Sequence, residues 1–189
     1  MYGSASTIVK ESKFPQGHFG LYFTADKILD LGEQVDVLII HYRPRASIML
    51  SDEQPISYFN PESANFNEIK TKAQIKGKDK PQGYMFGLEY LLWVPSVQHF
   101  SLFFMGTPTL RRESSDVLAL KGNSATFKIK FIPSKQYGGW HGMETLSCDA
   151  PFEIPPNDVI KNVYYSKFAN PRDSEIHVTD EGDEADRAR

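Results

Sequence analysis

The chain of 189 residues contains a single cysteine, Cys148, and no long apolar run. One cysteine cannot form an internal disulfide, and it cannot supply a zinc site built on paired cysteines. No run approaches the roughly 20 apolar residues that a membrane-spanning helix needs, and residues 1–10 lack the features of a secretory signal. We therefore expect a cytoplasmic protein that makes no use of a membrane.

Signatures of catalysis are also lacking. The sequence has no glycine-rich phosphate loop, no zinc-protease helix motif and no nucleophile elbow. Cys148 with His141 would be a nucleophile and its base, but a small buried thiol is the more frequent role. Glu89 interrupts an apolar strand pattern, and we expect it to point to solvent. The sequence thus predicts a protein that is not an enzyme and uses no metal or cofactor. An enzyme with a dispersed site remains the lowest-ranked alternative.

The small net charge of −3 hides an uneven distribution. Residues 173–189 hold seven acidic residues against Arg187 and Arg189, whereas residues 1–172 carry a charge of +2. Five lysines lie within 67–80, and six basic residues lie within 107–139. A mildly basic body with an acidic tail is typical of proteins that bind anionic partners, although a solvated C-terminus gives the same pattern.

Hydrophobic periodicity predicts mostly strands. Strand patterns cover 19–23, 33–46, a broken strand over 47–50 and 56–59, then 84–94, 98–105, 125–132 and 137–148. Helix patterns cover 63–72, 107–121 and 157–168, with a further helical turn over 24–31. The helix over 107–121 has the strongest start signal, because Thr107 can cap it and Pro108 suits its first position.

The order of these elements predicts a mainly β fold, an OB-fold-like β-barrel with one capped helix between strands and a short C-terminal helix. The strand over 98–105 is one more than the five-stranded OB barrel has. We divide the chain into a loose N-terminal arm (1–18), the barrel domain (19–170) and an acidic disordered tail (171–189). A small β-sandwich of an assembly protein would give a similar order of elements.

The sequence has more residues suited to binding nucleic acid than residues suited to catalysis. Non-specific binding of single strands needs cations for the backbone and aromatic faces for the bases. Basic and aromatic residues lie close together at several places, and we predict nucleic-acid contacts from Arg43, Arg45, Lys72, Lys76, Lys78, Lys128, Lys130, Tyr137 and Trp140. We expect the aromatic residues Phe100, Phe103, Phe104, Phe127 and Phe131 in the core.

In its layout the chain resembles phage and bacterial single-stranded-DNA-binding proteins, which join an OB-like domain to an acidic C-terminal tail. The resemblance implies a tail that competes for the basic groove or recruits replication and recombination proteins. The tail acids here are Asp180, Glu181, Asp183, Glu184 and Asp186. Tails of that family often end in a hydrophobic or aromatic residue, whereas this chain ends Asp186-Arg187-Ala188-Arg189.

The first hypothesis is therefore non-catalytic single-stranded DNA binding in replication or recombination, in the host cytoplasm if a phage encodes the chain. RNA as the ligand and a homo-oligomeric state stay open. The alternative is a structural β protein of a virion, whose aromatic strands would form core and subunit interfaces.

Overall fold

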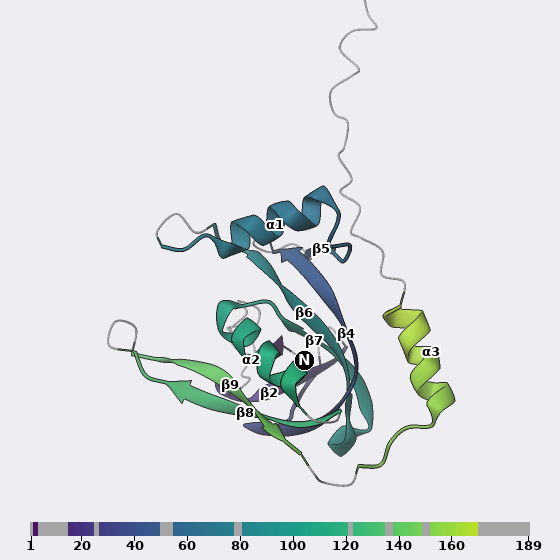
Figure 1. Cartoon of the computed structure of the whole chain (residues 1–189). Coiled ribbons are helices and arrows are strands. Elements are labelled where there is room, and N and C mark those ends of the chain that lie inside the picture. Colours follow the sequence, from purple (N-terminus) through teal and green to yellow (C-terminus); the bar gives the residue numbers. More distant parts are fainter. Residues whose placement is uncertain are drawn as a thin grey trace, which may run out of the picture.

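The computed structural model describes residues 2–3, 15–24, 27–49, 55–77, 81–120, 123–134, 138–148 and 152–169. Its arrangement is shown in Figure 1. The largest element is a six-stranded antiparallel sheet in the order β7-β6-β4-β8-β9, with β5 paired to β4. Its strands are β4 (Gln34–Ile48), β5 (Ile56–Tyr58), β6 (Tyr84–Val94), β7 (His99–Met105), β8 (Ser124–Ile132) and β9 (Trp140–Ser147). A short 3₁₀ helix, η2 (Pro95–Val97), connects β6 to β7.

A register shift in β4 decides which residues of the long strand face the core. The shift lies between Ile39 and His41, where β4 pairs with β6. A one-residue bulge moves every later side chain to the other face. Val37 before the shift and Ala46 after it are therefore both buried on the same side, which we call the inner face. His41, Arg43 and Arg45 lie on the opposite, outer face.

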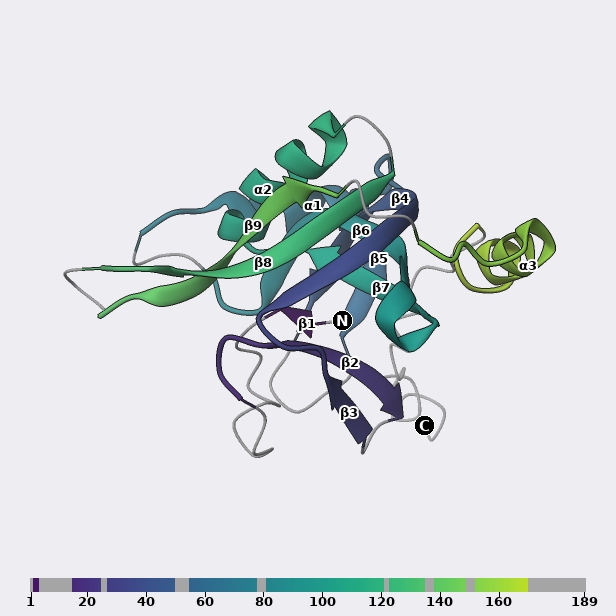
Figure 2. The ribbon, with the colours of Figure 1, turned by 90° about the horizontal axis from the view of Figure 1, so that it is seen from below.

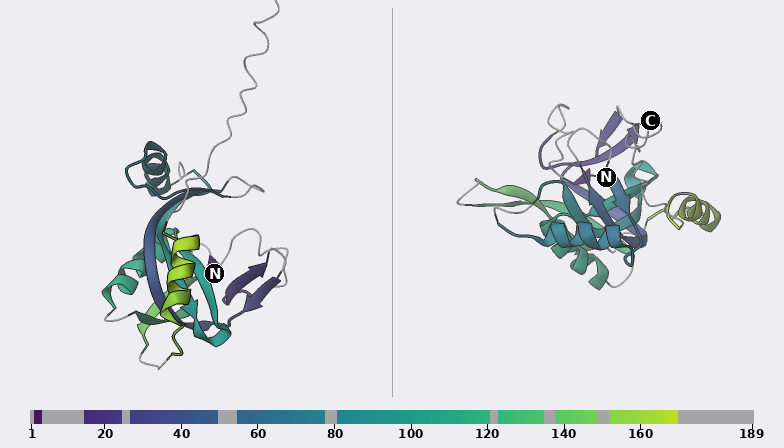
Figure 3. Two further views of the ribbon diagram at one scale, coloured as in Figure 1. Left: turned by 90° about the vertical axis from the view of Figure 1, so that its right-hand side faces the viewer. Right: turned by 90° about the horizontal axis from the view of Figure 1, so that it is seen from above.

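A second, smaller sheet comprises β1 (Tyr2–Gly3), β2 (Phe19–Thr24) and β3 (Lys27–Asp30). Figure 3 shows its purple strands to one side of the main sheet. The helical turn expected over 24–31 is wrong, because residues 27–30 pair with β2 as a strand. The four-residue segment is too short for periodicity to separate strand from helix, so pairing with a neighbour decides.

Three helices complete the described part of the chain: α1 (Ala64–Gln74), α2 (Pro108–Ala119) and α3 (Asn157–Lys167). The predicted start of α2 is confirmed: Pro108 occupies its first turn, and Thr107 Oγ1 accepts a hydrogen bond from the Leu110 amide. Ser63 caps α1 in the same way, through the Phe66 amide. Both caps satisfy amides that have no partner within their helix.

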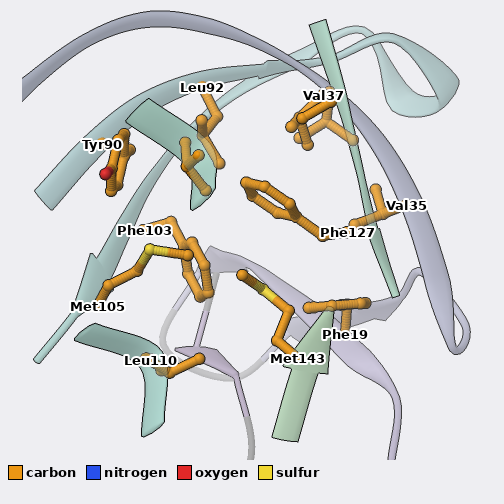
Figure 4. Packing of buried hydrophobic residues seen from close by; sticks show 13 residues of the cluster. Phe19, Val35, Val37, Tyr90, Leu92, Phe103, Met105, Leu110, Phe127 and Met143 are labelled. Carbon is orange, nitrogen blue, oxygen red and sulfur yellow. The ribbon is translucent and has the colours of Figure 1, made fainter. Parts of the chain in front are cut away.

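The main core lies between the inner face of the sheet, α2 and the small sheet. Figure 4 shows Phe103 and Phe127 at its centre, with Phe19 beside Met143. Thirteen buried residues form this cluster, and a second cluster of Ala46, Tyr58, Phe66 and Ile69 seats α1. Of the five phenylalanines expected in the core, Phe103 and Phe127 are buried in it. The expectation was wrong for the other three, because Phe100 and Phe104 are half-buried outside both clusters and Phe131 is 56% exposed.

The mainly β class is confirmed. In the described residues, β7 and β9 are the two ends of the main sheet and do not pair with each other. Helix α2 contacts both of these strands and β6. Among the described helices, none has the length and apolar character to cross a membrane.

Candidate anion-binding groove

Arg43 and Arg45 share one buried carboxylate. Glu89, opposite Arg43 in the β4–β6 register, is 1% exposed. Arg43 donates to Glu89 Oε2 through Nε at 2.8 Å and Nη2 at 2.6 Å, and Arg45 Nη1 donates to Oε1 at 2.5 Å. The expectation that Glu89 points to solvent was wrong, because two guanidinium groups compensate its charge inside the fold.

The two arginines are also covered by rings. Arg43 lies between the rings of Phe59 and Phe168, 4.1 and 4.2 Å from the ring centres, and Arg45 lies 4.7 Å from the Phe104 ring. Their side chains are only 12% and 14% exposed. The predicted contacts of these arginines with phosphates are therefore blocked in this structure, for Arg43 in part by Phe168 at the end of α3.

The predicted lysines Lys128 and Lys130 lie on a two-stranded arm. Figure 2 shows β8 and β9 extending together away from the rest of the protein. Lys130 lies 3.6 Å from Glu144, with both side chains largely exposed. Trp140, paired with Ile132 on the same ribbon, is 44% exposed, as a stacking residue would need.

Acidic side chains weaken the arm as a site for an anion. Burial, and then the neighbouring Asp116 and Glu144, raise the pKa of Glu113 above its usual value, against the lowering effects of the Thr145 amide and Lys130. Two carboxylates, Glu144 and Glu113, thus lie near Lys130, and a third, Asp116, lies near Glu113. Since carboxylates repel a polyanion over several ångströms, this face of the arm is a poor site for phosphates.

The remaining predicted residues fall into two groups. Lys72 Nζ is bound to Glu68 at 2.6 Å, with the tyrosine hydroxyl of Tyr84 at 3.4 Å, and these hydrogen bonds raise the pKa of Lys72. Lys76 is exposed just after α1. Lys78, Tyr137 and the tail acids lie outside the described residues.

A groove between α1 and α2 brings together residues that sequence reasoning did not combine. It has a volume of about 350 Å³ and crosses the inner face of β4 and β6. Its lining residues are Pro44, Pro61, Phe66, Lys70, Phe86, Gly87, Leu88, Arg111, Ser114, Ser115 and Leu118. The lining is mostly apolar, with one cation from each helix, and its size lies in the range of small-ligand sites.

Arg111 is the inner cation of the groove. Its Nη1 donates to the carbonyl oxygens of Gly106 (2.7 Å) and Phe86 (3.1 Å), and its guanidinium lies 4.2 Å from the centre of the Phe86 ring. Burial lowers the pKa of Arg111, and no acidic side chain of the described residues opposes that effect. Carbonyl dipoles therefore hold the group in place, and no carboxylate of the described residues lies within 4.0 Å of it.

Lys70 supplies the second cation. It is exposed on α1, its Nζ lies 6.0 Å from the centre of the Phe86 ring, and no carboxylate of the described residues lies within 4.0 Å of it. Phe86 thus lies near both cations, at the floor of the groove. Ser115 adds an exposed hydroxyl at the α2 wall.

Close packing positions this site. A Cβ on Gly87 would collide with the carbonyl oxygen of Met105 and would press on Cγ of Arg111. Glycine therefore lets α2 and the β6–β7 hairpin approach closely enough for Arg111 to reach two carbonyls. In the sequence, Gly87 within an apolar strand was the signal of such an approach, but nothing indicated that Lys70 would lie opposite Arg111.

The arrangement suits an anion with an apolar part. A negative group would interact with Lys70 and Arg111, and an apolar or planar part would cover Leu88, Leu118 and the prolines. In the described residues, no group of three or more His, Cys, Asp or Glu side chains is arranged to hold a metal. Comparisons with protein-family models, with curated proteins and with solved structures found no match.

Proposed function

We propose that the protein is a non-catalytic binding module for single-stranded nucleic acid, with DNA as the expected form in replication or recombination. The α1–α2 groove is the site. The observation that carries the proposal is the pair of cations, Lys70 and Arg111, that face an apolar groove floor without a carboxylate partner among the described residues.

The chemistry of a single strand matches both parts of the groove. Phosphates supply the negative charge, and their neutralisation by lysine and arginine dominates the affinity of such proteins. Exposed base faces supply the apolar surface that duplex DNA hides within its stack. The lining of Pro44, Leu88 and Leu118 therefore supports a preference for single strands over duplex.

The acidic tail has a role in the same proposal. Residues 173–189 carry a charge of −5, and an acidic segment of the same chain competes with phosphates for a cationic site. The tail then lowers the affinity for nucleic acid when salt is low, or it serves as a contact for replication or recombination proteins.

The test is a titration of a fluorescein-labelled thymine oligonucleotide at several salt concentrations. Lys70→Ala should weaken binding and reduce the slope of log affinity against log salt by about 1, the loss of one phosphate contact. Lys161→Ala is the matched control, because Lys161 is also an exposed lysine but lies on α3, away from the groove. It should leave the slope unchanged, and a duplex of equal length should bind more weakly.

Two results would contradict the proposal. The first is no binding of the oligonucleotide at low salt by the full chain or by a chain shortened at residue 170. The second is binding whose salt slope is the same for the parent, Lys70→Ala and Lys161→Ala, since that would locate the phosphate contacts elsewhere.

A structural or assembly role is the second candidate, and one observation favours it. The β8–β9 arm exposes Phe131, Trp140 and Leu146, each more than 40% accessible. Exposed apolar side chains on a protruding ribbon are typical of contacts between subunits. For this role, light scattering during size-exclusion chromatography should show a large assembly that the Trp140→Ser substitution dissociates. The nucleic-acid-binding role predicts a monomer or small oligomer for both the parent and Trp140→Ser.

A further inference from the structure

Helix α3 covers the outer face of β4 with two aromatic rings. The ring of Tyr164 is stacked on that of His41, with centres 5.0 Å apart and planes 29° apart. The ring of Phe168 lies over the guanidinium of Arg43 at 4.2 Å. Figure 1 shows α3 on the opposite side of β4 from α2, so this surface is separate from the groove.

These ring-on-imidazole and ring-on-guanidinium contacts resemble the contacts that a protein makes with stacked nucleic-acid bases. Single-strand-binding proteins stack bases on aromatic rings and on the guanidinium planes of arginine. The rings of Tyr164 and Phe168 lie 6.1 Å apart, and they rest on an imidazole and a guanidinium. Arg43 Nη1 also donates to the carbonyl oxygen of Phe168 at 2.7 Å, a bond that a base carbonyl or a phosphate oxygen can accept instead.

The cover is held by few contacts. No residue within α3 is buried, and the buried residues next to it are Pro155, just before its start, and Phe168, just beyond its end. On the N-terminal side, Trp93 Nε1 donates to the carbonyl oxygen of Glu153 at 3.1 Å. Segments with little buried surface are the ones that open locally at the lowest free energy.

Contacts that do not involve α3 hold the surface beneath it. Glu89 holds both Arg43 and Arg45, Arg45 Nε donates to Ser57 Oγ at 3.1 Å, and Phe59 backs the other side of Arg43. Two arginines against one carboxylate leave one positive charge in excess. A ligand that replaced Tyr164 and Phe168 would therefore meet a preformed surface of rings and guanidinium groups.

We propose that the outer face of β4, with His41 and Arg43, is a second binding surface for single-stranded nucleic acid, and that α3 is its cover, with Tyr164 and Phe168 in the places of two neighbouring bases. The inference takes its ligand from the function proposed above but uses a different site. A strand that binds there displaces α3.

The experiment uses the full chain and the same labelled thymine oligonucleotide. Tyr164→Ala should loosen the cover and tighten binding about fivefold, a typical coupling between two linked equilibria. Tyr165→Ala is the matched control, because Tyr165 is 65% exposed on the same helix and only the edge-to-face contact of its ring with Tyr164, 5.2 Å between centres, links it to the cover. It should change the affinity far less than Tyr164→Ala. Adding His41→Ala to Tyr164→Ala should remove the gain without disturbing Glu89.

Hydrogen exchange gives a second readout that needs no variant. Saturating oligonucleotide should speed the exchange of the α3 amides in the parent chain. If Tyr164→Ala binds no more tightly than Tyr165→Ala and the α3 amides stay protected with oligonucleotide present, the inference is overturned. The two variants keep the proposals apart. If Lys70→Ala binds the oligonucleotide as tightly as the parent does, the groove is contradicted. If Tyr164→Ala binds no more tightly than the parent does, the cover is contradicted. If neither the parent chain nor Tyr164→Ala binds the oligonucleotide, both proposals are overturned.

Discussion

Cationic side chains lie at both faces of the β4–β6 pair of strands, and their surroundings differ between the two faces. On the outer face, Arg43 and Arg45 share the buried Glu89 and lie under aromatic rings. On the inner face, Arg111 is held by two carbonyl oxygens and Lys70 lies across the groove, with no carboxylate at hydrogen-bond distance among the described residues. The first pair shares one buried carboxylate and is covered by rings, whereas the second is open to an anion from outside.

With α3 in place, the outer-face cations therefore stabilise the fold, whereas the groove cations can meet an anion directly. Breaking the outer-face cluster should cost stability, because a buried charge would lose its partner. Changing Lys70 should cost affinity and leave stability almost unaffected. The following variants test that division, and each is measured by urea denaturation.

Glu89→Gln should have the largest effect. The substitution keeps the volume of the side chain but leaves two largely buried guanidinium groups without their anion. We expect a loss of about 3–5 kcal/mol in the free energy of unfolding. Glu68→Gln, which breaks the exposed pair with Lys72, is the control and should change stability little. Equal effects of the two variants would show that the outer-face cluster is not a buried ion pair.

Gly87→Ala should come next. Its Cβ would collide with the Met105 carbonyl oxygen and press on Arg111. Overpacking of this kind typically costs about 1–3 kcal/mol, and the shift of Arg111 should also weaken oligonucleotide binding. Ser115→Ala, at the same groove, should change stability by less than about 0.5 kcal/mol. Unchanged stability and unchanged affinity in Gly87→Ala would contradict the close approach.

Removing the N-terminal caps of α1 and α2, the two helices that line the groove, should have a smaller effect on stability. Thr107→Ala and Ser63→Ala each remove one side-chain acceptor from a helix start, at a cost of about 1 kcal/mol. Thr107→Ala should also weaken oligonucleotide binding, since the Thr107 cap lies one turn before Arg111. Ser63→Ala should affect binding through the position of Lys70. Loss of binding without loss of stability would show that these side chains contact the ligand directly.

The smallest effect is expected from Glu113→Gln, and it depends on pH. Burial, then Asp116, raises the pKa of Glu113 in the folded state, so the ionised form destabilises the fold. The variant should be slightly more stable than the parent at pH 7. The gain should shrink as pH falls through the raised pKa and vanish below about pH 4, where the carboxyl is protonated in both folded and unfolded chains. A gain that persists at low pH would rule out this electrostatic cause.

Much of the fold followed from local patterns. Tyr84–Val94 is a strand with the predicted bounds, and α2 begins at the predicted cap, because apolar runs and capping residues act over a few neighbours. The bulge between Ile39 and His41 could not be predicted, since it depends on pairing with β6. The closure of the sheet, which the OB-like prediction required, depends on the same long-range pairing.

The candidate site was less predictable than the fold. Arg43 and Arg45 were expected at an open groove, but Glu89, 44 residues after Arg45 in the chain, meets them across two strands. Lys70 and Arg111 lie on helices that only tertiary packing brings together. Trp140, for which the sequence predicted a nucleic-acid contact, is 44% exposed on the β8–β9 arm.

The most direct test of the groove is to follow the backbone amide signals of the ¹⁵N-labelled protein during titration with a thymine oligonucleotide. The account predicts the earliest and largest shifts at Gly87, Arg111 and Ser115, and at the end of α1 that carries Lys70. Shifts confined to Lys128–Ile132 and Trp140 of the β8–β9 arm, or no shifts at low salt, would contradict it.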